Sequence, residues 1–98
     1  MEFEVSEELA NKVYQLVEKV KSSGKLKKGS NEVTKALERG EAKLVIAAGD
    51  VEPKDIILHF PVLCKEKEVQ FVIVPTKEEL GASAGLPVGT AAIAITNL

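Results

Sequence analysis

Leu44-Val45-Ile46-Ala47-Ala48 is an unbroken apolar run, and the turn-forming pair Gly49-Asp50 follows it directly. A run of this length without polar alternation is typical of a strand that is covered on both faces, as in parallel or mixed sheets. Two more apolar segments of strand length follow, at residues 69–74 and 90–96. Helical patterns separate the three segments, which favours an α/β protein built around a small sheet.

The two helical patterns that precede this run are bounded by recognisable ends. Ser6 is a favourable N-cap for the first helix, and Gly24 is a favourable C-terminal cap. Gly29-Ser30 opens the second helix, and Gly40 closes it. The apolar stripe of the first helix is predicted to comprise Leu9, Val13, Leu16, Val17 and Val20. The buried stripe of the second is predicted to comprise Val33, Ala36 and Leu37.

The later helices are marked by proline and by a capping motif. Pro53 suits the first position of a third helix that carries Ile56, Ile57 and Leu58. Pro61 is expected to interrupt this helix, which then continues for another turn or two to Lys67. Thr76 and Glu79 have capping-box spacing, so a fourth helix is predicted to start there and to end at Gly85, with Leu80 and Ala84 facing inward.

The predicted order is therefore helix, helix, strand, helix, strand, helix, strand, with residues 25–28 as a further edge strand. Strands that alternate with helices favour a three-layer α/β/α sandwich, here with a small mixed sheet. The 98 residues have the usual size of one domain, so residues 1–98 are interpreted as a single domain.

Composition excludes several classes of protein. No apolar run approaches the length of a membrane span, and residues 1–5 lack the basic and apolar regions of a signal peptide, so we expect a cytoplasmic protein without a membrane partner. Cys64 is the only cysteine, and its apolar surroundings favour a buried hydrophobe over a reactive thiol. His59 is the only histidine, for which we expect a structural or surface role rather than metal binding.

The sequence carries none of the common enzyme signatures. There is no dinucleotide-binding glycine motif, P-loop, nucleophile elbow or metal-ligand pair. Acidic pairs such as Glu78-Glu79 lie in the first turn of a predicted helix, where they serve as capping residues and need no catalytic role. We therefore predict a protein without catalytic residues, metal or cofactor.

The start of the second helix has the chemistry of a binding site. In Lys28-Gly29-Ser30-Asn31-Glu32-Val33-Thr34-Lys35, the glycine permits close approach, and the free amides of the helix start suit an electron-rich partner. Asn31 and Lys35 share a helix face, with Glu32 beside them and Arg39 one turn further. Asn, Glu and Lys together can read a guanine edge, whereas a carboxylate is out of place in a simple phosphate site. The alternative is an ordinary capped helix with Glu32 and Lys35 as a solvated pair.

Charge is distributed unevenly along the chain. The formal net charge of −2 is unlike that of a general nucleic-acid binder. Acidic residues, however, gather at the N-terminus, whereas basic residues gather between positions 21 and 39. A local basic face on an acidic protein suits recognition of one RNA shape. The basic residues are Lys21, Lys25, Lys27, Lys28, Lys35 and Arg39.

Residues 28–40 closely resemble the signature of the kink-turn-binding ribosomal protein superfamily, and most closely that of its archaeal members. The resemblance continues, in order, through residues 42–48, 50–53, 59–67, 74–77 and 80–81. It implies an α/β/α sandwich that binds a kink-turn, an RNA element with a three-nucleotide bulge and tandem sheared G·A pairs.

The resemblance also implies residue roles. Asn31 and Glu32 would contact the guanines of the G·A pairs, and Lys35 would reach a guanine or a phosphate. Gly29 would permit the close approach, and the apolar loop Leu86-Pro87-Val88 would pack on an extruded base. Backbone contacts are implied for Lys28, Arg39 and Lys77, and positions beside the bulge for Glu52 and Ile56. The loop departs from the archaeal pattern and is closer to that of bacterial relatives, which lack the Asn-Glu pair.

The implied partners are kink-turns in ribosomal RNA, box C/D or box H/ACA guide RNA, or ribonuclease P RNA, together with other ribonucleoprotein proteins. We expect a monomer when the protein is free. The alternative interpretation is a protein-interaction module of the same fold, against which the Asn31, Glu32 and Lys35 set argues.

Overall fold

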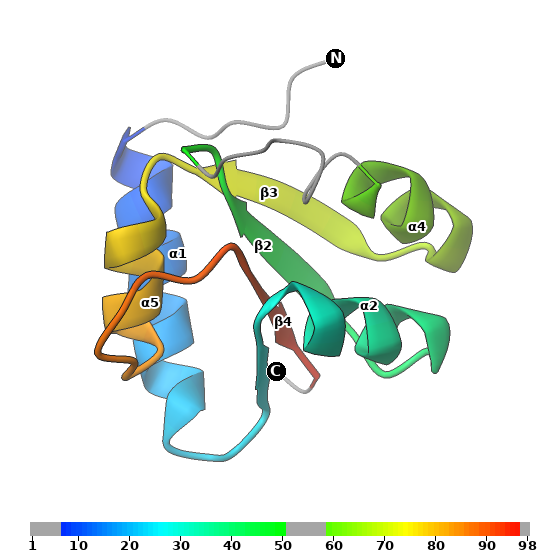
Figure 1. The fold of residues 1–98 in the computed structure, drawn as a ribbon, viewed down its shortest axis with the longest axis horizontal. Coiled ribbons are helices and arrows are strands. Elements are labelled where there is room, and N and C mark those ends of the chain that lie inside the picture. Colours follow the sequence, from blue (N-terminus) through cyan, green and yellow to red (C-terminus); the bar gives the residue numbers. More distant parts are fainter. Residues whose placement is uncertain (1–6, 51–58, 97–98) are drawn as a thin grey trace.

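A computed structural model describes residues 7–50 and 59–96, which form four helices and four strands (Figure 1). The helices are α1 (Glu7–Lys21), α2 (Ser30–Glu38), α4 (Phe60–Lys67) and α5 (Lys77–Ser83). The strands are β1 (Leu26–Lys28), β2 (Leu44–Ala48), β3 (Gln70–Val74) and β4 (Ala92–Ile95). The predicted order of elements, including the edge strand before the second helix, is confirmed in these ranges.

The four strands form one mixed sheet in the order β1-β4-β2-β3. β2 is parallel to β3, and β4 lies antiparallel between β1 and β2. Strands β1, β2 and β3 therefore point the same way. We call the end where these three strands finish and β4 begins the C-terminal end of the sheet, and the opposite end the N-terminal end.

Two pairs of helices cover the sheet. α1 packs beside α5, α2 packs beside α4, and the two pairs lie on opposite faces of the sheet (Figure 1). This arrangement confirms the predicted three-layer α/β/α sandwich. Every residue of β2 and β4 is buried, so both strands are covered on their two faces.

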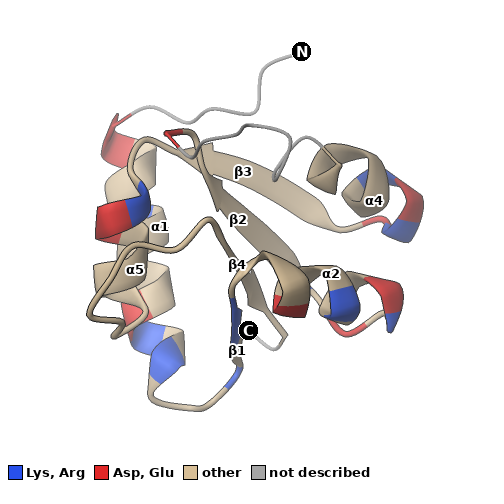
Figure 2. Cartoon of the chain, viewed as in Figure 1, with Lys and Arg blue, Asp and Glu red and all other residues tan. Residues whose placement is uncertain are grey.

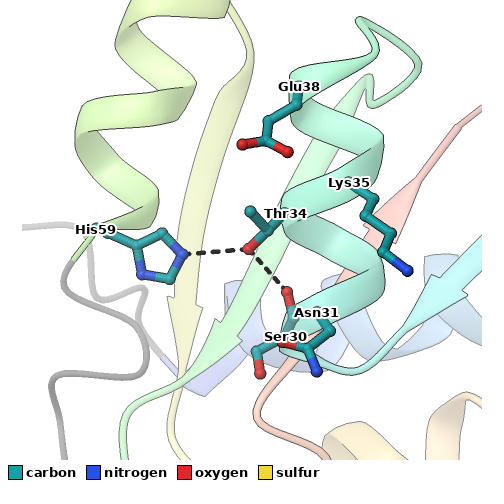
Figure 3. Close-up of a pocket in the computed structure, with 6 residues that line it drawn as sticks. All are labelled: Ser30, Asn31, Thr34, Lys35, Glu38 and His59. Carbon is teal, nitrogen blue, oxygen red and sulfur yellow. Dashed lines mark hydrogen bonds between the residues drawn. The ribbon is translucent and has the colours of Figure 1, made fainter.

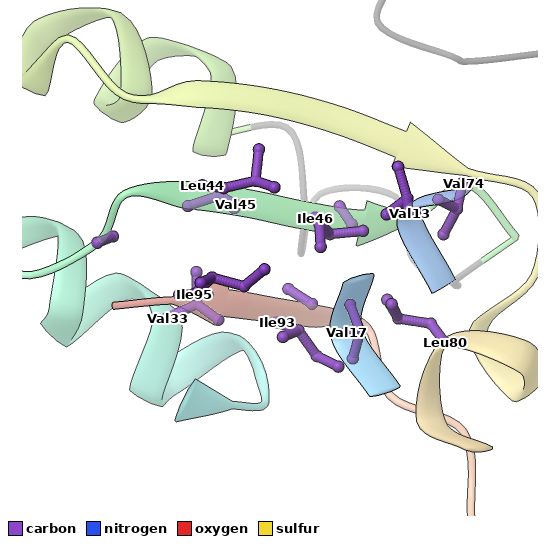
Figure 4. Close-up of a cluster of buried hydrophobic side chains, with 14 of the residues drawn as sticks. Val13, Val17, Val33, Leu44, Val45, Ile46, Val74, Leu80, Ile93 and Ile95 are labelled. Atoms are coloured by element: carbon purple, nitrogen blue, oxygen red, sulfur yellow. The ribbon is translucent and has the colours of Figure 1, made fainter. Parts of the chain in front are cut away.

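The core lies between these layers. Side chains from α1, α2, α5 and the central strands meet there, among them Val17, Val33, Leu80 and Ile93 (Figure 4). Each of these four is fully buried, and burying an aliphatic side chain of this size contributes roughly 1.5–3 kcal/mol. The apolar run at 44–48 thus behaves as its pattern predicted, because helices cover it from both sides.

The buried face of α1 differs from the predicted stripe. Leu9 is 46% exposed and Leu16 only partly buried, whereas Ala10 and Tyr14 are buried. Leu9 stands one residue, about 100°, round the helix from Ala10, so the two cannot both face the core centrally. The sequence pattern favoured Leu9 because it is the larger hydrophobe. The buried residues of α1 are Ala10, Val13, Tyr14, Val17 and Val20.

The predicted helix ends are mostly confirmed. Thr76 is the N-cap of α5, and its hydroxyl accepts a hydrogen bond from the amide of Glu79 at 3.3 Å. Gly24, Gly40 and Gly85 follow α1, α2 and α5 and all have positive φ, as C-terminal glycines do.

Pro61 lies in the first turn of α4, where its missing N–H breaks no helical hydrogen bond, and this helical segment ends at Lys67 as predicted. The predicted earlier part of this helix, from Pro53 through Ile56, Ile57 and Leu58, lies outside the described residues.

Cys64 is buried between α4 and the sheet, and burial raises the pKa of its thiol to about 11. The expectation of a buried small hydrophobe is confirmed. At pH 8, a thiol with this pKa has roughly a hundredfold less thiolate than one with a pKa near 9.

We therefore expect Cys64 in the native protein to react with a disulfide reagent at pH 8 at least about a hundred times more slowly than in the guanidinium-unfolded protein. Absorbance of the released thiolate measures both rates. Equal rates would show that the thiol is accessible and ionised in the native state, contrary to its burial.

Candidate nucleic-acid interface

Most of the predicted site residues gather at the C-terminal end of the sheet. Lys28 is the last residue of β1, and α2 starts just after it. Lys77 is the first residue of α5, which follows β3 at the same end. Residues 86–91 return the chain to the start of β4, also at this end. Strand direction alone therefore brings together segments that are far apart in the sequence.

A chain of hydrogen bonds fixes these segments relative to one another. The amide of Gly29 donates to the carbonyl of Ala92 at 2.9 Å. The hydroxyl of Thr90 donates to the same carbonyl at 3.2 Å, and the amide of Thr90 donates to the carbonyl of Lys77 at 3.1 Å. The starts of α2 and α5 are thus connected through the first residues of β4.

Asp50 and Thr90 are positioning residues that sequence reasoning missed. A carboxylate oxygen of Asp50 accepts the amide of Lys77 at 2.8 Å, which caps α5 from the end of β2. Thr90 is 7% exposed and holds the loop onto α5. The sequence position of Asp50 could have indicated this role. Asp50 comes just after a buried strand, where a side chain can reach the end of the neighbouring parallel strand.

The start of α2 is open. Gly29 is its N-cap, with φ 94° and ψ 150°, a conformation that is essentially restricted to glycine, and no side chain caps the helix. A methyl group at Gly29 would meet nothing within 4 Å, so this backbone faces open space. The first helical hydrogen bond runs from Val33 N to Gly29 O at 3.0 Å. The amides of Ser30, Asn31 and Glu32 precede it and have no acceptor among the described residues.

Asn31, Glu32 and Lys35 are all exposed on α2. The ammonium of Lys35 lies 3.9 Å from a carboxylate oxygen of Glu32, and both side chains are about half exposed, at 56% and 52%. An ion pair this long and this solvated contributes at most about 1 kcal/mol. The side-chain amide of Asn31 has no hydrogen-bond partner within residues 7–50 and 59–96. The solvated pair of the alternative interpretation is therefore present, but the ordinary side-chain cap is absent.

A groove runs along α2 beside the residue that precedes α4 (Figure 3). Thr34 donates its hydroxyl proton to the carbonyl of Ser30 at 2.9 Å. A hydroxyl has one proton, so at the 3.2 Å contact with His59 the ring Nε2 must be the donor. His59 thereby ties the first turn of α2 to the start of α4, in agreement with the structural or surface role expected for it. The groove has a volume of about 590 Å³, and its lining comprises Ser30, Asn31, Thr34, Lys35, Glu38 and His59.

The apolar loop lies against α5. Leu86 packs partly against the core, whereas Pro87 and Val88 are exposed, Val88 to 67%. With Glu78 and Ala82 of α5, these three residues line a shallow pocket of about 410 Å³. Pro87 and Val88 are thus the members of the predicted triplet whose apolar surface is most available.

The structure does not bring every predicted residue to this end. Arg39 is the C-cap of α2, about 15 Å along the helix from Gly29, at the far end. Glu52 and Ile56 lie outside the described residues. The residues that do gather are Lys28, Gly29, Asn31, Glu32, Lys35, Lys77, Leu86, Pro87 and Val88.

Within the described residues, no group of three or more His, Cys, Asp or Glu side chains is arranged to hold a metal ion. In the same ranges, no helix has both the length and the apolar character needed to cross a bilayer.

The loop depends on a close approach at Gly81. A methyl group there would overlap the carbonyl oxygen of Val88, and the amide of Leu86 donates to the carbonyl of Gly81 at 2.9 Å. Gly81→Ala gains up to about 1 kcal/mol of helix propensity, but a collision with backbone costs about 1–3 kcal/mol.

We expect Gly81→Ala to lower the free energy of unfolding by about 1–2 kcal/mol in a urea titration, because the collision outweighs the gain in propensity. The matched control, Ala82→Ser at the exposed neighbouring position, should change it by no more than about 0.5 kcal/mol. A stabilised Gly81→Ala protein would show that the loop is not held against α5.

Comparison with known proteins places the chain in a family. Residues 11–98 match the model of the Ribosomal protein L7Ae/L30e/S12e/Gadd45 family. The structure is similar to that of the Giardia lamblia 15.5kD RNA binding protein, with a TM-score of 0.93 and 36% sequence identity over 96% of this chain and 78% of the other. Both findings agree with the prediction of a binding protein rather than an enzyme. The chain belongs to the Ribosomal protein L7Ae/L30e/S12e/Gadd45 family.

Proposed function

We propose that this protein binds kink-turn RNA through the start of α2 and stabilises the kinked form within ribonucleoprotein particles. The observation that carries the proposal is the exposed Asn31-Glu32 pair, without a capping side chain, beside backbone that is open to a ligand. The similar Giardia protein is an RNA-binding protein by name, which supports RNA as the class of partner.

The carboxylate of Glu32 is the most selective part of this chemistry. A carboxylate repels phosphates, so a direct contact between Glu32 and RNA requires a donor on a base. The amino and imino groups of guanine are such donors, and Asn31 offers both an acceptor and a donor beside them. Lys35 suits guanine O6 or N7, or a phosphate. The three side chains together fit the guanines of tandem sheared G·A pairs.

Access to base edges explains why a kink is needed. The major groove of regular A-form RNA is too narrow for side chains to read, and a sharp bend opens it locally. The helix start that carries Asn31 and Glu32 would enter this opening, with Gly29 leaving room for the RNA backbone. Lys28 and Lys77, both exposed, would neutralise phosphates on either side.

The loop completes the proposed contact. Pro87 and Val88 present apolar surface above a shallow pocket, on which an unstacked base of the bulge can rest. The family resemblance assigns Glu52 and Ile56 to positions beside the same bulge, and Arg39 to a contact with the RNA backbone.

The proposed mechanism is a shift in population without any chemical step. A protein that binds bent RNA more tightly than extended RNA favours the bent form by its difference in affinity. The bent RNA then offers a fixed shape to other proteins of the particle. Ribosomal RNA, box C/D and box H/ACA guide RNA and ribonuclease P RNA are the proposed sources of such elements.

Glu32→Ala separates base recognition from electrostatics. Removal of a carboxylate beside a polyanion should strengthen binding if charge alone matters, yet we expect a loss of about 1–3 kcal/mol, or 5- to 150-fold in Kd. Asn31→Ala should lose a similar amount. Fluorescence anisotropy with a labelled kink-turn RNA measures these changes.

Glu38→Ala is the matched control, since it removes an exposed carboxylate from the same helix. We expect this variant to bind as well as the unmodified protein or slightly better. If Glu32→Ala and Glu38→Ala behave alike, Glu32 does not read a base and the assignment of the guanine contacts fails.

A further inference from the structure

Three lysines form a second basic surface at the N-terminal end of the sheet. A groove of about 460 Å³ lies there, and we name it the lysine groove after Lys25, Lys27 and Lys43, which line it. The turn glycines Gly24 and Gly40 line it too. The ribbon is blue, the colour of Lys and Arg, at the end of α1 and along β1 in Figure 2. None of these three lysines belongs to the site proposed above.

The backbone of the lysine groove is fixed by the end of β4. The amide and hydroxyl of Thr96 donate to the carbonyl of Lys25 at 2.9 and 3.1 Å. The amide of Lys43 donates to the carbonyl of Ile95 at 2.7 Å. Lys25 and Lys43 therefore flank β4 on its two sides, about two strand spacings or 10 Å apart.

Lys27 and Lys28 are neighbours in sequence but belong to different surfaces. They are successive residues of β1, so their side chains point to opposite faces of the sheet. Lys27 lines the lysine groove, and Lys28 does not. The basic cluster in the sequence is thus divided by the pleat of an edge strand.

The lysine groove carries uncompensated positive charge. All three lysines are exposed, and no carboxylate lies within 4.0 Å of their ammonium groups among the described residues, where the pair of Glu32 and Lys35 is the one ion pair. Glu41 is the one acidic residue lining the lysine groove, which leaves a local charge of +2 on a chain whose net charge is −2. A bound polyanion would relieve the repulsion between the lysines.

We propose that the lysine groove is a second, sequence-independent RNA contact, which binds the phosphates of a stem that flanks the kinked element. This inference rests on the proposed function. Gly40 follows α2, about 13.5 Å along the helix from Asn31, so the lysine groove lies roughly five base-pair steps of A-form RNA from the proposed guanine contacts. A continuous stem can span that separation.

The chemistry of the lysine groove suits phosphates rather than bases. Its lining offers ammonium groups but neither an aromatic ring for stacking nor a side-chain amide for a base edge. The three lysine charges are spread over the two sides of β4, so they match a row of phosphates better than they match one small anion. The lysine groove should therefore add affinity and salt dependence, and no sequence preference.

The test compares two charge-matched triple variants. The groove variant carries Lys25→Gln, Lys27→Gln and Lys43→Gln, which remove the three positive charges of the lysine groove. The control variant carries Lys12→Gln, Lys65→Gln and Lys67→Gln, which remove the same charge from exposed positions on α1 and α4. The probe is a kink-turn RNA with two stems of about fourteen base pairs, which in A-form RNA are longer than the 28 Å extent of the protein. Anisotropy titrations over a range of salt concentrations give Kd and its salt slope.

We expect the groove variant to reduce the slope of log Kd against log salt by about 2–3, since each released phosphate contact is worth about 0.9. The control variant should reduce it by less than about 1. Truncation of one stem to about three base pairs, which in A-form RNA is shorter than the separation of about 13.5 Å, should abolish the difference between the groove variant and the unmodified protein, because that stem no longer reaches the lysine groove. Circular dichroism confirms that both variants fold.

Equal slopes for the two triple variants would overturn the inference, and the proposed function would stand if Asn31→Ala still weakened binding. Unmodified protein that binds this RNA no better than a fully paired duplex would mark failure of the proposed function instead. A parallel titration uses polyglutamate as a model of an acidic protein. If the groove variant loses binding to polyglutamate while its salt slope for RNA is unchanged, the inference is also overturned, because the lysine groove then binds an acidic protein.

Discussion

Strand β4 is the constraint on which both surfaces of this protein depend. It lies between β1 and β2, it is buried throughout, and each of its ends holds two other segments. At its start, Ala92 accepts the amide of Gly29, and Ala91 accepts the amide of Ala48 at 2.9 Å. Its last residues hold the chain at Lys43 and Lys25. The positions of the helix start and of the lysine groove are therefore set by one short strand that is shielded from water.

This arrangement provides a rigid frame for an exposed site. Most of the residues proposed to touch RNA lie at or near the ends of regular elements, and hydrogen bonds from the backbone and from Asp50 and Thr90 hold these ends in place. Binding to a preformed surface avoids the cost of ordering a loop, which otherwise reduces affinity. The Thr34–His59 contact adds to this rigidity, since it ties the first turn of α2 to the start of α4. In the proposed function, the RNA is therefore the partner that bends.

The architecture was predictable because its signals are local. The unbroken apolar run at 44–48 is enough to indicate a central strand that is buried on both faces. The capping motif of Thr76 and Glu79 lies within one turn of helix, so it can be recognised without knowledge of the rest of the chain. The motif at 28–35 likewise predicted an open helix start. The failure came from a choice that depends on packing, that of Leu9 against Ala10 on α1. Residue spacing cannot decide such choices, because both options have nearly the same pattern.

Other features depend on contacts between distant segments, which no short motif contains. Asp50 caps a helix that begins at Lys77, and Thr90 connects that helix to β4. The spacing that puts Arg39 on the face of Lys35 says nothing of its distance from the loops at the other end of α2. Similarly, the three basic residues between positions 25 and 28 resemble one patch in the sequence, but the strand places Lys27 and Lys28 on opposite faces of the sheet.

Discrimination between tandem sheared G·A pairs and Watson–Crick pairs tests the central claim most directly. The measurement is a titration of the unmodified protein against a kink-turn RNA and against the same RNA with its tandem G·A pairs changed to Watson–Crick pairs. We expect the altered RNA to bind at least about a thousandfold more weakly, as non-specific sites do. Equal, weak and salt-sensitive binding to both RNAs would contradict recognition of the kink-turn by Asn31 and Glu32.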